Sequence, residues 1–553
     1  MFPRLITRYG LATHLALLAS LPFALFPFLS ESDLSQVIFC LSGLASLWLV
    51  VEPSMRAGEH LSIARRRVLG SLVRDVAFWL FLCVLVVALV RYLNSDVALA
   101  YVQDEWTVRD PSSPGLPASA GSAGLLPLAV LTGMSVVVLG IRHGIGLTGR
   151  ISFGLTASFV MGLSGLAMVA CACLKVPSFM SAAKAHLLEG PFWMPFWGPG
   201  FGVWLICALA FGAQAEARKW GASHVPFCLA VAGNASGLLF FSPPPISSVF
   251  LIVAVLVSIF CLAYLGRAGS MGASARSFVF ILLGFATPFF FSAILPDEIE
   301  FDNCVRQTGT VTETVKEPVQ NIYAVKAGGF LAVDKEQSET YRALSPMLSD
   351  IAKAVWKKHP WYGAGTGAFR LHAPFIATKE ELKTFQQHKN DWRTLLISQQ
   401  MKDASKRARE AREKGRESVS EFDWTAVRPY NRNPVCAFNS YWTFLAEHGL
   451  LGVALAVLGL GVLIFSYVAR LVQAVLYLRA QDDADVVIFA CPPIVWATPF
   501  AVVLLLVLAL YEPIFEIAPM LLVCTVPLAV AAASFPKKPA PRPLAVQIEG
   551  ESR

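Results

Sequence analysis

The sequence predicts an all-α polytopic membrane protein, and three observations lead to that fold class. Of its 553 residues, 55% are apolar and only 15% are charged, whereas a soluble globular domain carries about 25% charged residues. Apolar runs of about 20 residues, the length that crosses a bilayer as a helix, recur along most of the chain. Lys and Arg gather in alternate loops between these runs, which explains the net charge of +7 without a nucleic-acid partner.

The apolar runs predict about twelve transmembrane helices, because a lipid environment requires each backbone polar group to be satisfied within its own helix. They lie at about 11–29, 34–51, 74–93, 123–141, 151–172, 199–215, 224–242, 246–265, 277–295, 441–468, 486–510 and 514–534. The first run has no clear small-residue cleavage site after it and a second run follows at once. We therefore expect it to stay in place as a span.

The basic loops predict the orientation of these spans. Stretches such as RHGIGLTGR, QAEARKWGASH and GRAGSMGASAR all fall on one side of a chain with twelve spans, and the positive-inside rule assigns that side to the cytoplasm. Both termini are then cytoplasmic. The chain divides into spans one to nine (1–295), a partly helical extracytoplasmic loop domain (296–440), spans ten to twelve (441–534) and a Pro-rich tail predicted to be disordered (535–553).

Two cysteines differ from the rest. Most of the 11 cysteines fall inside apolar runs, but Cys304 and Cys436 lie near the two ends of the long loop. In an oxidising compartment they either form a disulfide that joins the two ends or remain free thiols. The spacing of Cys and His residues matches no metal site, so we expect no metal.

The long loop contains a glycine-rich motif, HPWYGAGTGAFR, at residues 359–370. Its glycines permit backbone turns that few other residues adopt. Successive N–H groups in such a turn either cradle an anion or belong to an ordinary tight turn. His359 and Arg370 flank the motif, and Arg342 lies upstream on a predicted helix. Arginine at these positions either grips a phosphate group or is solvated.

A second motif, FNSYWTFLAEHGLLG at residues 438–452, opens the tenth predicted span. Together the topology and the two motifs resemble the O-antigen ligase and polymerase superfamily of bacterial envelopes. Members have about twelve spans and a large periplasmic loop between spans nine and ten. That loop carries a phrase like HPxxGxGxGxF, which 359–369 matches, and ends on HNxYxxxLAExGxxG. Matching positions in the second phrase are Asn439, Tyr441, Leu445, Ala446, Glu447, Gly449 and Gly452.

The resemblance implies a reaction and a location. Such enzymes, in the bacterial inner membrane, move a glycan from a polyprenyl diphosphate carrier to an acceptor, which is the lipid A core, another repeat unit or a protein. Arginines hold the diphosphate leaving group and a histidine acts as base, with no metal or other cofactor. On this basis the predicted substrate-binding residues are Arg342, Gly363, Gly365, Gly367, Arg370, Asn439 and Tyr441.

The sequence departs from the family pattern at two places. Phe438 occupies the position of the family's histidine, and FFSPPPISS lacks the Ser-Arg step expected at the outer end of span seven. Three hypotheses follow. The base has moved to His359, His372 or Glu447; the protein performs polymerase-type or other transfer with different groups; or it has lost catalysis and acts as a partner in envelope glycan assembly. For Glu447 a structural or acceptor-positioning role is the alternative.

A transporter or flippase of lipid-linked glycan is the hypothesis from a different class. Ion-coupled transporters bury ionisable residues in the middle of spans, and these spans contain almost none. A discontinuous helix is the other mark of a transporter. The stretch GNASG at 233–237, in span seven, is the best candidate for such a break.

Overall fold

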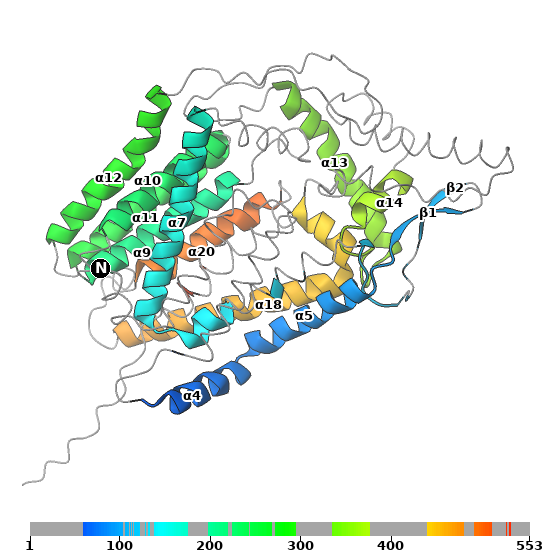
Figure 1. The fold of residues 1–553 in the computed structure, drawn as a ribbon, viewed down its shortest axis with the longest axis horizontal. Helices are drawn as coiled ribbons and strands as arrows, with labels where there is room; N and C mark the ends of the chain where they lie inside the picture. The colour runs from blue at the N-terminus through cyan, green and yellow to red at the C-terminus, as the bar shows by residue number, and fades with distance from the viewer. Residues whose placement is uncertain are drawn as a thin grey trace, which may run out of the picture.

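The computed structural model describes residues 59–102, 105–109, 115–121, 138–174, 197–218, 224–242, 244–267, 271–294, 335–376, 439–479 and 492–510, with isolated positions outside these ranges. Within them it is mainly helical (Figure 1), and seven helices are long and apolar enough to cross a membrane. An eighth apolar helix, α20 (Pro493–Leu508), is shorter. The total of twelve spans stays a prediction, because spans one and two and most of spans four and twelve lie outside the described residues.

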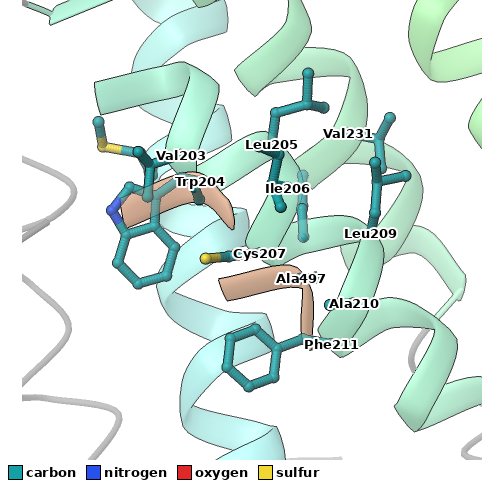
Figure 2. Close-up of a cluster of buried hydrophobic side chains, with 14 of the residues drawn as sticks. Val203, Trp204, Leu205, Ile206, Cys207, Leu209, Ala210, Phe211, Val231 and Ala497 are labelled. Carbon is teal, nitrogen blue, oxygen red and sulfur yellow. The ribbon is translucent and has the colours of Figure 1, made fainter. Parts of the chain in front are cut away.

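A bundle built around α9 (Trp197–Ala217) forms the largest part of the described fold. Four helices make the most extensive contacts with α9: α7 (Leu147–Cys173), α10 (His224–Phe241), α11 (Pro244–Arg267) and α20. Figure 2 shows Trp204, Cys207 and Phe211 of α9 in one cluster with Val231 of α10 and Ala497 of α20. Because α9 is apolar and buried on all sides, its neighbours shield it from lipid. The helix α12 (Met271–Ile294) packs on α10 and α11.

Helices α7 and α10 cross in direct backbone contact. A Cβ atom on Gly233 would lie 1.9 Å from the carbonyl oxygen of Gly162, and one on Gly165 would lie 2.4 Å from the carbonyl oxygen of Gly233. Small residues at such crossings let two membrane helices approach closely and gain van der Waals contact. The glycine of GNASG therefore serves helix packing.

The candidate helix break at GNASG is not present in the structure. Residues 233–237 lie inside α10 and are helical throughout. The Asn234 amide donates one hydrogen bond to the Ala230 carbonyl of its own helix, at 2.7 Å, and another to the Ser158 carbonyl of α7, at 2.8 Å. The polar side chain therefore joins two intact helices, and the sequence signal for a discontinuous transporter helix loses its basis.

At the edge of the bundle, α18 (Ser440–Arg479) packs beside α5 (Val76–Leu93), as Figure 1 shows. The sequence predicts one continuous span over 441–468. The structure corrects this, since Gly449 has non-helical dihedral angles (φ 62°, ψ −168°) and divides α18 into two helical pieces. The apolar candidate segment Ser440–Gly459 includes this kink. A straight membrane-crossing helix therefore begins only after Gly449.

The connection after α5 contains a β-hairpin, which a purely helical fold class did not predict. Strands β1 (Ala98–Val102) and β2 (Glu105–Arg109) pair antiparallel, with Ala98 opposite Arg109. Their sequences, ALAYV and EWTVR, are rich in the aromatic and β-branched residues that favour strands. Two further helices, α13 (Lys335–Lys358) and α14 (Phe369–Ile376), lie at the same end of α5 as this hairpin (Figure 1).

The opposite end of α5 gathers charged residues. Asp75 caps α5 by accepting a hydrogen bond from the Ala77 N–H, at 3.1 Å. Arg142 Nε and His143 Nε2, from the π-helix η2 (Gly140–Gly144), each lie 2.7 Å from Asp75 Oδ2. Two predicted cytoplasmic loops, those that contain Asp75 and Arg142, thus meet at one end of α5, and the hairpin, α13 and α14, which are predicted to be extracytoplasmic, lie at the other. The alternation agrees with the predicted topology, and the orientation in the membrane stays a prediction.

Candidate functional site

The two sequence motifs dock on each other at the kink of α18. We call residues 359–369 together with 446–451 the clasp. The N–H of Ala364 donates to the carbonyl oxygen of Ala446, at 2.8 Å, and the N–H of Gly365 donates to that of Glu447, at 3.1 Å. Segments about eighty residues apart in the sequence therefore form one backbone unit.

The clasp supplies hydrogen-bond partners for the backbone groups of α18 that the kink leaves without helical partners. In an uninterrupted helix each N–H bonds to the carbonyl four residues earlier, so Leu450 and Leu451 would bond within α18. Instead, Leu450 N–H donates to the carbonyl of Pro360, at 2.9 Å, and Leu451 N–H to that of Trp361, at 3.0 Å. Two consecutive steps of the helical ladder are opened, and the glycine-rich loop satisfies both the carbonyls and the N–H groups.

Glycine is required at the centre of the clasp. Gly363 and Gly449 both have positive φ, at 75° and 62°, a region that most residues avoid. A Cβ on Gly363 would also lie 2.3 Å from the carbonyl oxygen of Glu447. Gly365, with φ of 109°, faces the carbonyl oxygen of Ala118, which would lie 2.8 Å from an added Cβ. The spacing G-x-G in one motif and E-x-G in the other thus reflects one close backbone contact.

Of the two alternatives for this turn, an anion cradle or an ordinary tight turn, its N–H groups form the second. The donors to backbone carbonyl oxygens are the N–H groups of Gly363, Ala364, Gly365, Thr366 and Ala368. The Thr366 bond, at 3.1 Å to Ala118, joins the turn to the segment after the β-hairpin. These donors are occupied, so the structure supports the tight-turn alternative. Gly363 and Gly365 hold the fold, and Gly367 adopts a positive φ of 72° in the same turn.

Asn439 and Tyr441 fasten the first half of α18. The Asn439 side-chain oxygen accepts hydrogen bonds from the N–H groups of Tyr441, at 3.0 Å, and Trp442, at 3.2 Å, which is the usual geometry of a helix N-cap. The Tyr441 hydroxyl donates to the carbonyl of Leu506 on α20, at 2.8 Å. The polar groups of these two predicted substrate-binding residues therefore position α18 against α20.

Glu447 is placed as a structural carboxylate. Its side chain is buried, and Oε1 accepts a 3.4 Å hydrogen bond from the N–H of Phe369, the first residue of α14. A carboxylate at a helix N-terminus is stabilised by the helix dipole. Its charge also attracts the Arg91 guanidinium. A general base must reach the acceptor hydroxyl directly or through one water molecule, so this buried position favours the structural alternative for Glu447.

The structure brings the other two candidate bases together. His359, at the end of α13, and His372, in α14, have ring centroids 5.2 Å apart. Both side chains are half-buried. The clasp fixes the spacing of their helices, because it joins α13 to α14 through a turn held by backbone hydrogen bonds. Either imidazole can take a proton from a hydroxyl group that reaches this surface.

Sequence reasoning missed a pair of residues beside the clasp, Arg91 and His448. Arg91 lies in the last turn of α5 and is 7% exposed. Its Nη1 forms a hydrogen bond with His448 Nδ1, and its Nη2 donates to the His448 carbonyl at 3.4 Å. One signal was present in the sequence: a cation at the predicted extracytoplasmic end of a span, where cations are scarce.

Several predicted residues are only partly placed or not placed. Arg342 lies on α13 and Arg370 on α14, but their side chains are outside the described set. Phe438, Cys304 and Cys436 also lie outside the described residues, so the disulfide stays a prediction. In the part of the chain that is described, no group of three or more His, Cys, Asp or Glu side chains has the arrangement of a metal site.

No protein-family model matches the chain, and no curated protein matches it. Function is therefore inferred from the two motifs and from the geometry that joins them.

Proposed function

We propose that the protein is a glycosyltransferase of the membrane, which moves a glycan from a polyprenyl diphosphate carrier to an envelope acceptor. One observation carries the proposal. The two motifs on which the resemblance to the O-antigen ligase and polymerase superfamily rests, within 359–369 and 438–452, are hydrogen-bonded to each other in the clasp. If each motif resembled the family only by chance, contact between the two motifs in the fold would not be expected. Their contact supports a single shared site.

The chemistry assigned to this site is a direct displacement. The acceptor hydroxyl oxygen attacks the anomeric carbon of the glycan, and the bond from that carbon to the diphosphate oxygen breaks. The diphosphate leaves with the bonding electron pair, and the hydroxyl proton passes to His359 or His372. Arg342 and Arg370, on the two helices that the clasp joins, are proposed to hold the negative charge of the leaving group.

The surroundings of the clasp suit a lipid-linked donor. The clasp lies at the end of α5 (Figure 1), and this helix exposes Trp79, Leu82, Val86 and Leu89 along its length. A polyprenyl chain can remain in the bilayer beside such an apolar face while its diphosphate lies at the surface. We place this surface on the extracytoplasmic side of a bacterial inner membrane, as the basic loops predict.

Two alternatives are distinguished by the same assay. Phe438, where the family has its histidine, favours a non-catalytic relative that binds the carrier for another enzyme. A flippase is disfavoured by the continuous helix through 233–237, although carrier movement without chemistry is its direct signature.

The test uses the purified full-length protein in lipid vesicles with a polyprenyl-diphosphate-linked glycan and an envelope extract as acceptor. We expect free polyprenyl diphosphate to appear only with acceptor, together with glycan attached to it. Carrier binding without release at saturating acceptor would overturn the transferase and support the non-catalytic relative. Carrier crossing the bilayer with its glycosidic bond intact would support the flippase.

A further inference from the structure

The guanidinium of Arg91 has one N–H donor without a hydrogen-bond partner in the described part of the chain. Arginine is always protonated and carries only donors, and burying its charge is unfavourable unless other groups compensate it. Glu447 supplies an attractive charge, and His448 receives Nη1 and Nη2. Nε, however, is buried and has no hydrogen-bond partner in the described part of the chain. A buried donor without a partner is unusual and points to a missing acceptor.

The contact with Arg91 fixes the tautomer of His448. Because Arg91 only donates, His448 Nδ1 must accept, and the proton of the neutral ring is then on Nε2. The ring also packs on Phe444, with centroids 4.4 Å apart, which holds its plane. A nitrogen that already carries a proton cannot remove another, so in this contact His448 is a second donor and not a substitute for the missing base.

The lack of a side chain at Gly452 leaves space for the side chains of Arg91 and His448. An added Cβ would lie 2.4 Å from the Cβ of His448 and 3.7 Å from Nη2 of Arg91. Gly452 is one of the positions at which the second motif matches the family pattern, whereas Arg91 and His448 occupy no motif position. The kink at Gly449 therefore brings two donors of this chain together at the same end of α5 as the clasp.

From this geometry we propose that Arg91 and His448 bind the diphosphate of the lipid carrier. The inference rests on the proposed function and deepens it, because it assigns two further residues to the lipid carrier. Arg91 Nε–H and His448 Nε2–H are the donors, and phosphate oxygens are the acceptors. Arg91 lies in the last turn of an apolar helix that is long enough to cross a membrane, and the end of such a helix reaches the level of the lipid headgroups in a bilayer. The predicted ligand class is a diphosphate ester attached to a polyprenyl chain.

A binding experiment tests the pair directly. Full-length protein in nanodiscs is titrated with farnesyl diphosphate, farnesol and inorganic diphosphate, and the dissociation constants are compared. We expect saturable binding of farnesyl diphosphate and much weaker binding of farnesol. Inorganic diphosphate that binds as tightly as the lipid would show that the site takes free diphosphate, and it would overturn the assignment to a lipid carrier.

Substitutions separate the two side chains. Arg91→Gln should weaken farnesyl diphosphate binding about 30-fold, because it removes charge-assisted hydrogen bonds. His448→Phe should weaken it about tenfold, whereas His448→Gln, which retains an N–H donor, should stay within about threefold of the wild type. Arg65→Gln, on the exposed side of α4 (Leu61–Val73) at the other end of α5, is the matched control and should bind as the wild type does.

The outcomes that overturn the inference are equal affinities in the wild type, Arg91→Gln and His448→Phe, or no saturable binding by the wild type. If Arg91→Gln fails to fold, His448→Phe decides, because it retains an aromatic ring to pack on Phe444. Binding that depends on Arg91, without any release of polyprenyl diphosphate, would reject the proposed transfer and leave this inference standing. If the wild type transfers glycan but Arg91→Gln and His448→Phe bind farnesyl diphosphate as tightly as it does, the proposed transfer would stand and this inference would be rejected.

Discussion

A Cβ atom on Gly449 would lie 2.4 Å from the backbone nitrogen of Gly363. No side chain fits between these two positions, and both have positive φ. The kink in α18 and the turn after α13 therefore depend on each other. The two motifs that stand out in the sequence are two halves of one backbone contact.

Replacing Gly449 by Ala should open the clasp. The substitution imposes a left-handed conformation on a residue with a side chain and pushes the turn from α18, so we expect a loss of about 3 kcal/mol. Thermal unfolding of the purified protein in detergent measures it. Gly461→Ala is the control, because Gly461 is helical and no heavy atom lies within 4 Å of its added Cβ. Equal unfolding midpoints for the two variants would contradict the clasp.

Replacing Gly233 by Ala should separate α7 from α10. The added methyl group would meet the Gly162 carbonyl oxygen at 1.9 Å, and overpacking of this kind costs about 1–3 kcal/mol. The expected result is a lower unfolding midpoint. Gly266→Ala, in α11, has open space around the added Cβ and should not lower the midpoint. A midpoint for Gly233→Ala equal to that of the wild type would show that the two helices do not cross as described.

The positions of most described membrane helices along the chain could be predicted from the sequence. The predicted span 224–242 corresponds to α10 (His224–Phe241), and 74–93 corresponds to α5 (Val76–Leu93). Long apolar runs specify helices because lipid offers their backbone groups no other partner. The same argument fails for span ten, since a run that is apolar throughout does not reveal that Gly449 interrupts it.

The candidate site was predicted less well, for reasons of distance along the chain. The turn around Gly363 and Gly365 was identified, but the carbonyls that occupy its N–H groups come from Ala446, Glu447 and other segments that only folding brings near. Arg91 and His448 are separated by 357 positions. No local pattern joins such residues, so their contact became visible only in three dimensions.

Asp75 should make the contact between the start of α5 and η2 sensitive to acid. Burial works to raise the pKa of this carboxyl, but the hydrogen bond from His143 and the charge of Arg142 outweigh burial, so the folded-state pKa lies below the usual value. The stability from Asp75 is therefore complete above an unfolded-state pKa of about 3.9, and it is lost as the pH falls through the lower folded-state pKa.

The variant Asp75→Asn tests this dependence. At pH 7 it should unfold at a lower temperature than the wild type, with a loss of about 3 kcal/mol from breaking a buried ion pair. Below about pH 4 the difference should shrink, because the carboxyl of the unfolded wild type then takes up a proton, and it should disappear as the pH falls through the lower folded-state pKa. Unfolding midpoints between pH 7 and pH 3 measure this. A difference that stays constant over the whole range would contradict the role of the charge.

The two neighbouring histidines and Glu447 should respond differently to substitution. Removing both imidazoles, in His359→Ala/His372→Ala, should lower transfer by about 100-fold or more, as expected for a lost general base. Glu447→Gln should lower the unfolding midpoint instead, because the carboxylate caps α14 and faces Arg91. Initial rates and midpoints measured on the same preparations separate the two effects. Normal transfer by the double histidine variant would remove both residues from the mechanism.

The central claim, that the clasp is the site of glycan transfer, is tested most directly by acceptor-dependent release of polyprenyl diphosphate from wild-type protein and from Gly449→Ala. The two proteins are compared at a temperature at which the variant remains folded. The wild type should release the carrier only when acceptor is present, and the variant should lose that release, whereas Gly461→Ala should retain it. Undiminished release by Gly449→Ala, or no release by the wild type with any acceptor, would contradict the claim.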